Sequence, residues 1–281
     1  MEDNLFINVG GNLMDFRSPK VMGIVNVTPD SFYGGSRVET AEAVRRRVAE
    51  MRRDGADIID IGGFSSRPGA SDVSPEEEYN RLAGGLEAVR IEWPEAIVSV
   101  DTFRAEVARR CVEEWNVAIV NDIGGGTLDP DMWNTVGELG VTYVLMHMRG
   151  TPATMTGLSD YGDVTAEVLS DLAFKLAELR EAGVADVIID PGFGFAKTVE
   201  QNYRLLADLR EFRVLGAPLL AGLSRKTMIW KTLGVTADEA RDGTIALDTV
   251  ALMNGADILR VHDVRPAVET IKLLEQLPSN G

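Results

Sequence analysis

The sequence predicts an α/β fold, a single-domain (β/α)8 TIM barrel, from three observations. Eight short apolar segments rich in Val and Ile recur along the chain. Each is followed by a charged stretch with the apolar spacing of an amphipathic helix, and this alternation is typical of parallel α/β folds. The length of 281 residues, 45% of them hydrophobic, matches the usual size of such a barrel. Eight units favour the barrel over an open Rossmann sheet, which usually has fewer strands.

The expected elements follow one another without a linker or composition shift, so one domain over residues 1–281 is the simplest interpretation, although the length also allows two small domains. Strands are predicted at 21–27, 56–61, 97–100, 117–120, 141–146, 186–189, 218–221 and 257–261. Helices are predicted at 40–54, 75–91, 103–115, 163–183, 201–212, 238–255 and 266–277, with a shorter one at 129–140. Several helices end at Gly55, Gly140, Gly183 or Gly255, because glycine adopts the left-handed conformation that stops a helix. Residues 1–19 are expected to be an N-terminal extension or hairpin.

Charge and composition exclude several classes of function. The net charge of −16 repels a phosphate backbone, so nucleic acid is not expected as a partner. No apolar run approaches the roughly 18 residues that a bilayer span needs, and the first residues lack the basic start of a secretory signal, so we expect a cytoplasmic protein without membrane contact. Cys111 is the single cysteine, which excludes an internal disulfide. With only His147 and His262 present, any metal is expected to be a hard cation held by oxygen ligands.

Polar residues stand where the expected strands end. These positions are Asn26, Asp60, Asp101, Asn121, Asp122, His147, Asp190, Ser224, Arg225, Lys226, Arg260 and His262. In a parallel barrel these ends share one rim, where active sites are built. An isolated Asp at a strand end is more often a helix cap or turn residue, and we interpret Asp60 and Asp122 in that way.

Glycine-containing loops at 26–35, 62–70, 124–126 and 190–197 follow the same strands. Together with Arg67, Lys197, Lys226, Arg260 and His262 they predict a cationic pocket for an anionic, phosphorylated ligand. Buried basic groups gain nothing in an acidic chain unless a ligand compensates them. The basic run 45–47 lies on a helical stretch and is expected to be a solvated face.

Eight motifs, in order along the chain, resemble the dihydropteroate synthase family. They are VMGIVNVTPDSF (21–32), IDIGGFSSRPGA (59–70), VSVDT (98–102), VNDI (120–123), LMHM (145–148), DPGFGFAK (190–197), GLSRK (222–226) and RVHD (260–263). The resemblance implies a (β/α)8 barrel that condenses (7,8-dihydropterin-6-yl)methyl diphosphate with 4-aminobenzoate. The products would be 7,8-dihydropteroate and diphosphate, in folate biosynthesis. It also implies inhibition by sulfonamides, which mimic 4-aminobenzoate, and a homodimer formed through outer helices near the C-terminus.

The resemblance assigns site residues by their match to the family motifs. Pterin binding is assigned to Asp101, Asn121, Asp190 and Lys226, and a pterin edge of alternating donors and acceptors suits these groups. Diphosphate binding is assigned to Asn26, Ser66, Arg67, Arg260 and His262, with Asn26 as the protein ligand of the cofactor Mg²⁺. The 4-aminobenzoate pocket is assigned to Arg67, Pro68, Phe195, Ser224 and Lys226. Catalytic roles fall to Asp101, Lys226 and Arg67.

The sequence departs from the family pattern in its second loop. Many members have Glu where this chain has Phe64, and Thr where it has Ser66. Ser66 keeps the hydroxyl, whereas Phe64 removes a carboxylate near the second substrate. The loops 28–35 and 64–72 have few apolar anchors, so we expect them to become ordered when substrate binds.

Two other functions share parts of this pattern. A pterin-binding methyltransferase has the same barrel and an Asp-Asn pterin site, but the residues assigned to diphosphate and 4-aminobenzoate favour the synthase. A catalytically silent pterin-binding relative would be expected to lack Lys226, Arg67 or His262, and all three are present.

Overall fold

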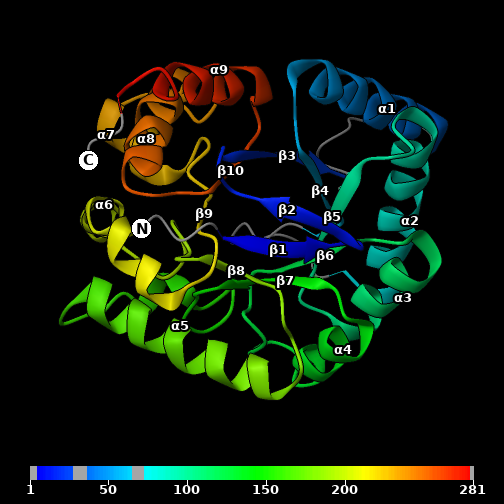
Figure 1. The fold of residues 1–281 in the computed structure, drawn as a ribbon, viewed down its shortest axis with the longest axis horizontal. Coiled ribbons are helices and arrows are strands. Elements are labelled where there is room, and N and C mark those ends of the chain that lie inside the picture. Colours follow the sequence, from blue (N-terminus) through cyan, green and yellow to red (C-terminus); the bar gives the residue numbers. More distant parts are fainter. Residues whose placement is uncertain (1–4, 28–36, 65–72, 279–281) are drawn as a thin grey trace.

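Eight parallel strands form the centre of the molecule, as the sequence predicts (Figure 1). The computed structural model describes residues 5–27, 37–64 and 73–278. Its barrel strands are β3 (Lys20–Asn26), β4 (Ile58–Gly62), β5 (Ile97–Asp101), β6 (Ile119–Asp122), β7 (Thr142–Met146), β8 (Val187–Asp190), β9 (Leu220–Ala221) and β10 (Ile258–Val261). They pair in the order β8-β7-β6-β5-β4-β3-β10-β9. A parallel bridge between Ile189 and Leu219 joins β8 to the segment before β9 and closes the barrel.

Helices surround the strands on the outside (Figure 1). They are α1 (Arg37–Asp54), α2 (Pro75–Glu92), α3 (Ala105–Trp115), α4 (Met132–Leu139), α5 (Val164–Glu181), α6 (Val199–Ala207), α7 (Thr227–Leu233), α8 (Arg241–Met253) and α9 (Val264–Leu274), with short 3-10 helices η2 (Met155–Gly157) and η3 (Leu209–Leu215). Local chemistry sets their ends: the Ser74 hydroxyl accepts the N–H of Glu77 at 3.2 Å at the start of α2, where Pro75 occupies the first turn. Within the described residues, no helix is both long enough and apolar enough to cross a membrane.

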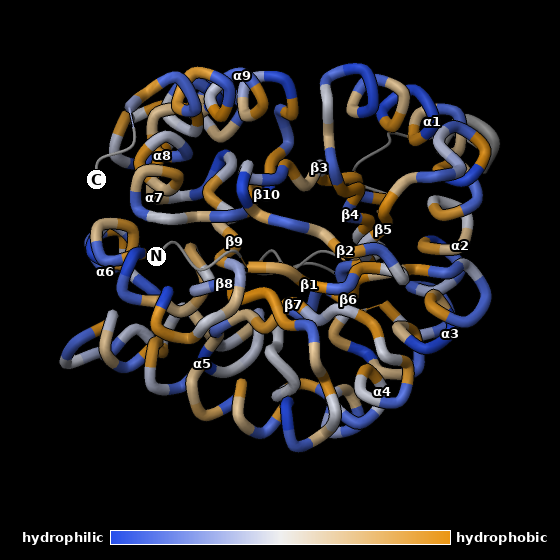
Figure 2. The backbone as a smooth tube through the Cα atoms, in the orientation of Figure 1, coloured by the Kyte–Doolittle hydropathy of each residue, from blue (hydrophilic) through white to orange (hydrophobic). Residues whose placement is uncertain are grey.

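Two apolar layers hold the barrel together, and Figure 2 colours much of the strand backbone between them as hydrophobic. The larger lies between strands and helices, and the smaller fills the barrel interior with side chains such as Met22, Ile58 and Ile258. Strand side chains point alternately into these two layers, so both faces of each strand are apolar. This explains why the strands are continuous apolar runs in the sequence.

An N-terminal hairpin covers one end of the barrel. It consists of β1 (Phe6–Val9) and β2 (Asn12–Asp15), paired antiparallel. Ile7, Val9 and Met14 are buried against the interior layer. The backbone N–H of Asn8 donates to Asp186 at 2.8 Å, which ties the hairpin to the segment before β8. Since Asp186 precedes β8, the hairpin covers the amino ends of the strands and leaves the opposite rim free.

Two helical segments differ from the prediction. The expected helix 201–212 is divided into α6 and the 3-10 helix η3, because the N–H of Asp208 bonds to the carbonyls of both Arg204 and Leu206 and the last turn tightens. The seven-residue helix α7 lies between two expected elements and is too short to show an apolar period. By contrast, Gly55, Gly140, Gly183 and Gly255 all have positive φ, as expected of residues that end helices.

Candidate active site

Four residues at the carboxyl ends of neighbouring strands lie in one row. Asn26 on β3 pairs with Gly62 on β4, Gly62 pairs with Asp101 on β5, and Asp101 pairs with Asn121 on β6. A Cβ atom on Gly62 would lie 3.4 Å from Asn26 Oδ1 and 3.6 Å from Asp101 Cβ. The bare glycine therefore leaves room between the amide and the carboxylate, and three predicted site residues face one rim.

Arg260 on β10 joins the carboxylates of this rim. Its Nε donates to Asp60 Oδ2 at 2.7 Å, and its Nη2 donates to Asp101 Oδ2 at 2.7 Å. The same oxygen of Asp60 accepts a hydrogen bond from Asn121 Nδ2 at 3.1 Å. Burial alone would lower the pKa of Arg260, but the two carboxylates raise it, so the guanidinium stays charged. Burial raises the pKa of Asp101 to about 7, with Arg260 opposing the rise and the like charge of Asp60 adding to it.

The interpretation of Asp60 as a cap or turn residue is wrong. Asp60 lies in the middle of β4, is fully buried, and accepts hydrogen bonds from Arg260 and Asn121. Its other oxygen, Oδ1, has no hydrogen-bond partner among the described residues. Asp122 does act in a turn, because its carboxylate accepts the N–H groups of Gly124 at 2.7 Å and Gly126 at 2.8 Å. Asp60 is thus a site residue that the sequence alone did not reveal.

Asp190 and Lys226 form the opposite part of the rim. A Cβ atom on Gly222 would lie 3.7 Å from Lys226 Nζ and 4.0 Å from Asp190 Oδ2, so both groups border the same small residue. The Lys226 ammonium donates to the carbonyl of Phe193 and lies 5.0 Å from the ring centroid of Phe195. Burial raises the pKa of Asp190 and lowers the pKa of Lys226 to about 8, and their mutual attraction opposes both shifts. These residues place a carboxylate and an ammonium around the same small residue, with the ammonium over the face of an aromatic ring.

His262 and Ser224 form a pair beside Arg260. Ser224 Oγ accepts the backbone N–H of His262 at 3.2 Å and lies 2.9 Å from its Nδ1. The serine hydroxyl can donate its hydrogen to Nδ1, and a neutral ring that accepts this hydrogen bond carries its own proton on Nε2. Burial, with Arg260 next in effect, lowers the pKa of His262 to about 4, so the ring is neutral at pH 7.

The prediction of a cationic pocket holds only in part. Arg260 is already compensated by Asp60 and Asp101. Lys197 has no N–H donor left for a ligand. Its Nζ contacts Gly192 O at 2.9 Å, Phe195 O at 3.0 Å and Nδ1 of His147 at 3.0 Å. The expectation that only a ligand could compensate buried basic groups is therefore wrong for these two residues, since the protein itself does so.

The second loop can be described only at its edges. Ser66, Arg67 and Pro68 lie outside the described residues, and so does the loop 28–35. The expectation that the loops 28–35 and 64–72 become ordered on binding concerns those residues and stays a prediction. Phe64, which precedes the gap, packs edge-on against Phe103 with ring centroids 5.3 Å apart. The guanidinium of Arg104 lies over Phe103 at 4.6 Å, pairs with the buried Glu78 and donates to Val73 O at 2.8 Å. Its distance to the Phe64 ring centroid is 5.7 Å. Arg104 therefore contacts residues on both sides of the gap, and no sequence motif pointed to it.

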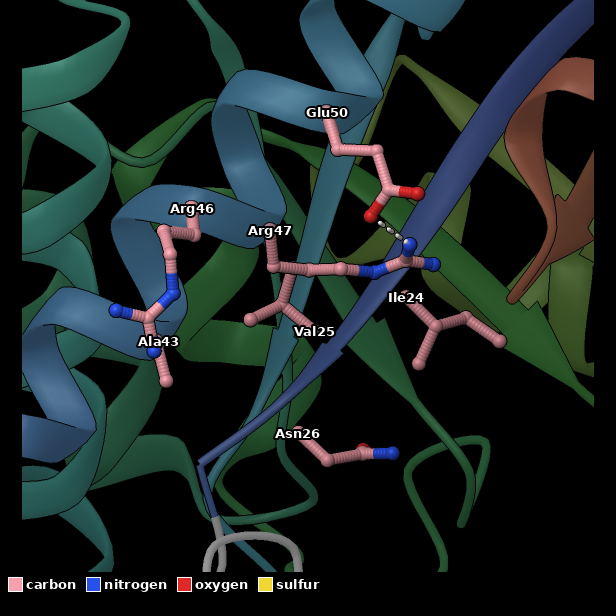
Figure 3. Close-up of a pocket in the computed structure, with 7 residues that line it drawn as sticks. All are labelled: Ile24, Val25, Asn26, Ala43, Arg46, Arg47 and Glu50. Carbon is pink, nitrogen blue, oxygen red and sulfur yellow. Dashed lines mark hydrogen bonds and ion pairs between the residues drawn. The ribbon is translucent and has the colours of Figure 1, made fainter.

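A hollow of about 410 Å³ lies beside Asn26, between β3 and α1 (Figure 3). Arg47 extends across it, donates to Glu50 at 2.7 Å and bonds to the backbone carbonyl of His262. Arg46 also lines the hollow and pairs with Glu42 at 3.0 Å. The expected solvated face thus includes one residue, Arg47, that supports the rim.

The described part of the chain contains no group of three or more His, Cys, Asp or Glu side chains that could hold a metal ion. Asn26 is exposed at the end of β3, and no described residue forms a hydrogen bond with its side chain. An exposed amide oxygen near Asp101 suits a cation that takes most of its ligands from phosphate and water.

Comparison with known proteins identifies one set of relatives. Residues 22–262 match the family described as pterin binding enzyme. The chain is 42% identical to dihydropteroate synthase of Escherichia coli K12, over 94% of each protein. It is 41% identical to the mitochondrial folate synthesis bifunctional protein of Arabidopsis thaliana, over 96% of this chain but 51% of that protein, and so spans about half its length. The solved dihydropteroate synthase of Xanthomonas albilineans with 4-aminobenzoic acid is 37% identical, with a TM-score of 0.89 and coverage of 98% of this chain and 100% of that one.

Proposed function

Because this chain belongs to the dihydropteroate synthase family of pterin-binding enzymes, we propose that different residues of its rim bind the different parts of the substrates in one condensation reaction. The reaction joins (7,8-dihydropterin-6-yl)methyl diphosphate to 4-aminobenzoate and gives 7,8-dihydropteroate and diphosphate. One observation carries the assignment: the Asp60–Arg260–Asp101 network and the Asp190–Lys226 pair lie at the same rim.

The pterin ring binds between these two groups. Asp190 accepts from the 2-amino and N3 edge, and Lys226 donates to the carbonyl side. Asn121 and Asp101 meet the ring from the other strands. Asn121 and Asp190 are buried and Asp101 and Lys226 are partly buried, so hydrogen bonds to the ring replace contacts with water.

The diphosphate binds on the side of Arg260 and His262. The neutral His262 ring presents its Nε2–H, because Ser224 occupies Nδ1. Ser66, Arg67 and Asn26 complete this side according to the family pattern. Arg260, held by two carboxylates, is already in place when the charge of the leaving group develops, so no reorganisation is needed in the transition state.

Asn26 is the protein ligand for Mg²⁺. Its exposed amide oxygen fits a cation that needs only one or two protein oxygens when diphosphate and water supply the rest. When bound, Mg²⁺ neutralises part of the charge of the departing diphosphate.

The 4-aminobenzoate binds against Phe195 and Lys226, with Ser224, Arg67 and Pro68 at the same pocket. The Lys226 ammonium above the Phe195 ring offers a positive charge for the carboxylate and an aromatic face for the aniline. Sulfonamides compete for this pocket because they mimic the same anion and ring.

The chemistry begins when the bond between the pterin methylene carbon and the diphosphate oxygen breaks, and the bonding electrons leave with diphosphate. The electron-rich pterin ring delocalises the resulting positive charge, and ionised Asp101 stabilises it. The aniline nitrogen then forms the new bond to the methylene carbon and loses one proton to solvent. Arg260 and His262 hold the diphosphate while this occurs.

A homodimer in the cytoplasm is part of the proposal. Leu233, Met253 and Leu273 expose large apolar surfaces on α7, α8 and α9, which lie together in Figure 1. A single buried cysteine suits a reducing compartment. Light scattering of the purified protein tests the dimer, and a monomeric mass at micromolar concentration would contradict it.

Diphosphate release tests the reaction directly. Purified protein is given the dihydropterin diphosphate and Mg²⁺, with and without 4-aminobenzoate. We expect release that depends on 4-aminobenzoate, with 7,8-dihydropteroate as the product. Omission of Mg²⁺ and the Asn26→Ala variant test the cofactor separately. Turnover unaffected by chelation would remove Mg²⁺ from the proposal while leaving the reaction in place.

A further inference from the structure

Lys197 places its ammonium group inside a ring of acceptors at the end of β8. Its Nζ lies 2.9 Å from Gly192 O, 3.0 Å from Phe195 O and 3.0 Å from Nδ1 of His147. An ammonium has three N–H donors, so these three acceptors use all of them. Lys226 differs, because the described residues give its Nζ one hydrogen bond, to Phe193 O. One lysine of the rim is thus saturated by the protein, and the other keeps donors for a ligand.

Two of the three acceptors of Lys197 belong to the segment that carries Asp190 and Phe195. Asp190 Oδ1 accepts the N–H of Gly192 at 2.8 Å, so the carboxylate and the Gly192 peptide form one unit. Gly192 has φ +73°, and a Cβ atom there would lie 2.0 Å from His147 O. The segment therefore packs directly on the chain that follows β7, and Lys197 bonds to it at both Gly192 and Phe195.

The third acceptor fixes the segment to the neighbouring strand. His147 is buried at the end of β7, and burial, then Lys197, lower its pKa to about 2. A neutral ring leaves Nδ1 free to accept from the ammonium. Burial lowers the pKa of Lys197 itself to about 7, while Asp190 opposes the shift. Three hydrogen bonds and an adjacent carboxylate thus hold the ammonium in place.

We propose that Lys197 is a positioning residue of this enzyme, which holds Asp190 toward the pterin and Phe195 toward 4-aminobenzoate by binding the backbone between them. The inference rests on the roles of Asp190 and Phe195 in the proposed function. It assigns Lys197 no contact with either substrate. Its effect is exerted through the carbonyls of Gly192 and Phe195.

The Lys197→Met variant tests the proposal, because methionine has a similar length but no N–H donor. We expect both substrates, the dihydropterin diphosphate and 4-aminobenzoate, to show an approximately tenfold higher KM, with kcat changed much less. Lys175→Met is the matched control, since Lys175 is also buried and pairs with Asp171 at 2.8 Å on α5. We expect the control to lose stability with both KM values unchanged.

Several results would overturn the proposal. Normal KM values in folded Lys197→Met protein would do so, as would equal changes in Lys175→Met. If Lys197→Met does not fold, Lys197→Gln is measured instead. Its shorter side chain carries only two N–H donors and cannot satisfy all three acceptors, so normal KM values there would also count against the role. Asp190→Asn is measured in parallel by calorimetric binding of a dihydropterin. If that variant binds the pterin normally, the assignment of Asp190 fails; if it alone loses binding, the assignment stands and the role of Lys197 fails.

Discussion

Replacement of Asp60 by Asn removes one of the two carboxylates that bind Arg260 and leaves the volume of the side chain almost unchanged. Breaking a buried ion pair typically costs about 3–5 kcal/mol, because a charge is left without a partner. Asp101 still lies 2.7 Å from Arg260, so the guanidinium stays compensated. We therefore expect the free energy of unfolding to fall by a smaller amount, about 2 kcal/mol.

The same substitution should change the pH dependence of activity. Burial raises the pKa of Asp101 to about 7, and the negative charge of Asp60 contributes to the rise. Without that charge, the pKa of Asp101 should fall, so the ionised form persists to lower pH. Since the proposed chemistry needs ionised Asp101, the acidic limb of kcat/KM should move to lower pH.

Urea unfolding and a pH profile of kcat/KM measure both effects. Asp257→Asn is the control, because Asp257 is also buried and pairs with Arg213 at 3.1 Å, on the amino side of β10 and outside the Asp60–Arg260–Asp101 network. The control should lose stability without a shift of the acidic limb. An acidic limb that stays in place in Asp60→Asn would refute the coupling between the two carboxylates.

Four further outcomes follow from the same geometry. Lys226→Ala should lower turnover by roughly two orders of magnitude with the fold retained, measured by product formation and circular dichroism; near-normal turnover would remove Lys226 from the site. The pKa of Lys226, lowered by burial to about 8, places the basic limb of the free enzyme's kcat/KM near pH 8, and activity still rising at pH 9 would contradict it. The pKa of Asp101 is raised from 3.8 to about 7 in the folded protein, so its stabilising contribution is complete below pH 4 and is lost as the pH rises through 7. In urea titrations at several pH values, Asp101→Asn should therefore reduce the dependence of the free energy of unfolding on pH. Cys111 is buried and burial raises its pKa to about 12, so it should resist thiol reagents until the protein unfolds, and fast labelling of the native protein would show an open core.

The sequence predicted the strands well because parallel barrel strands are apolar on both faces. The expected segment 257–261 and the observed β10 (Ile258–Val261) differ by one residue at one end. The first strand, expected at 21–27, is displaced by one residue as β3 (Lys20–Asn26). Short helices carry less periodic information, which is why α7 was not predicted.

The direction of charged side chains could not be read from the sequence. Asp60 and Arg260 are 200 positions apart, and only the closed barrel brings them within 2.7 Å. Lys197 follows a strand end like the other rim residues, but its side chain folds back onto the carbonyls of its own loop. Family resemblance supplied roles for Asp101, Asn121, Asp190 and Lys226, whereas the network that fixes their geometry is visible only in three dimensions. The roles of Ser66, Arg67 and Pro68 stay predictions.

The N-terminal hairpin, which covers the amino ends of the barrel strands, affects the order in which the chain folds. It is made from some of the earliest residues, but its partners come late: Thr142 donates to the carbonyl of Asn8 at 2.8 Å, and Asn8 in turn donates to Asp186. Loops of more than one hundred residues must close before these contacts form, which makes them slow to appear. Docking of the hairpin should therefore be a late folding step, which occurs when the eight-stranded barrel is complete. A fluorescent label at the exposed Leu13 would follow that step in real time, without touching the end of the barrel where substrates meet.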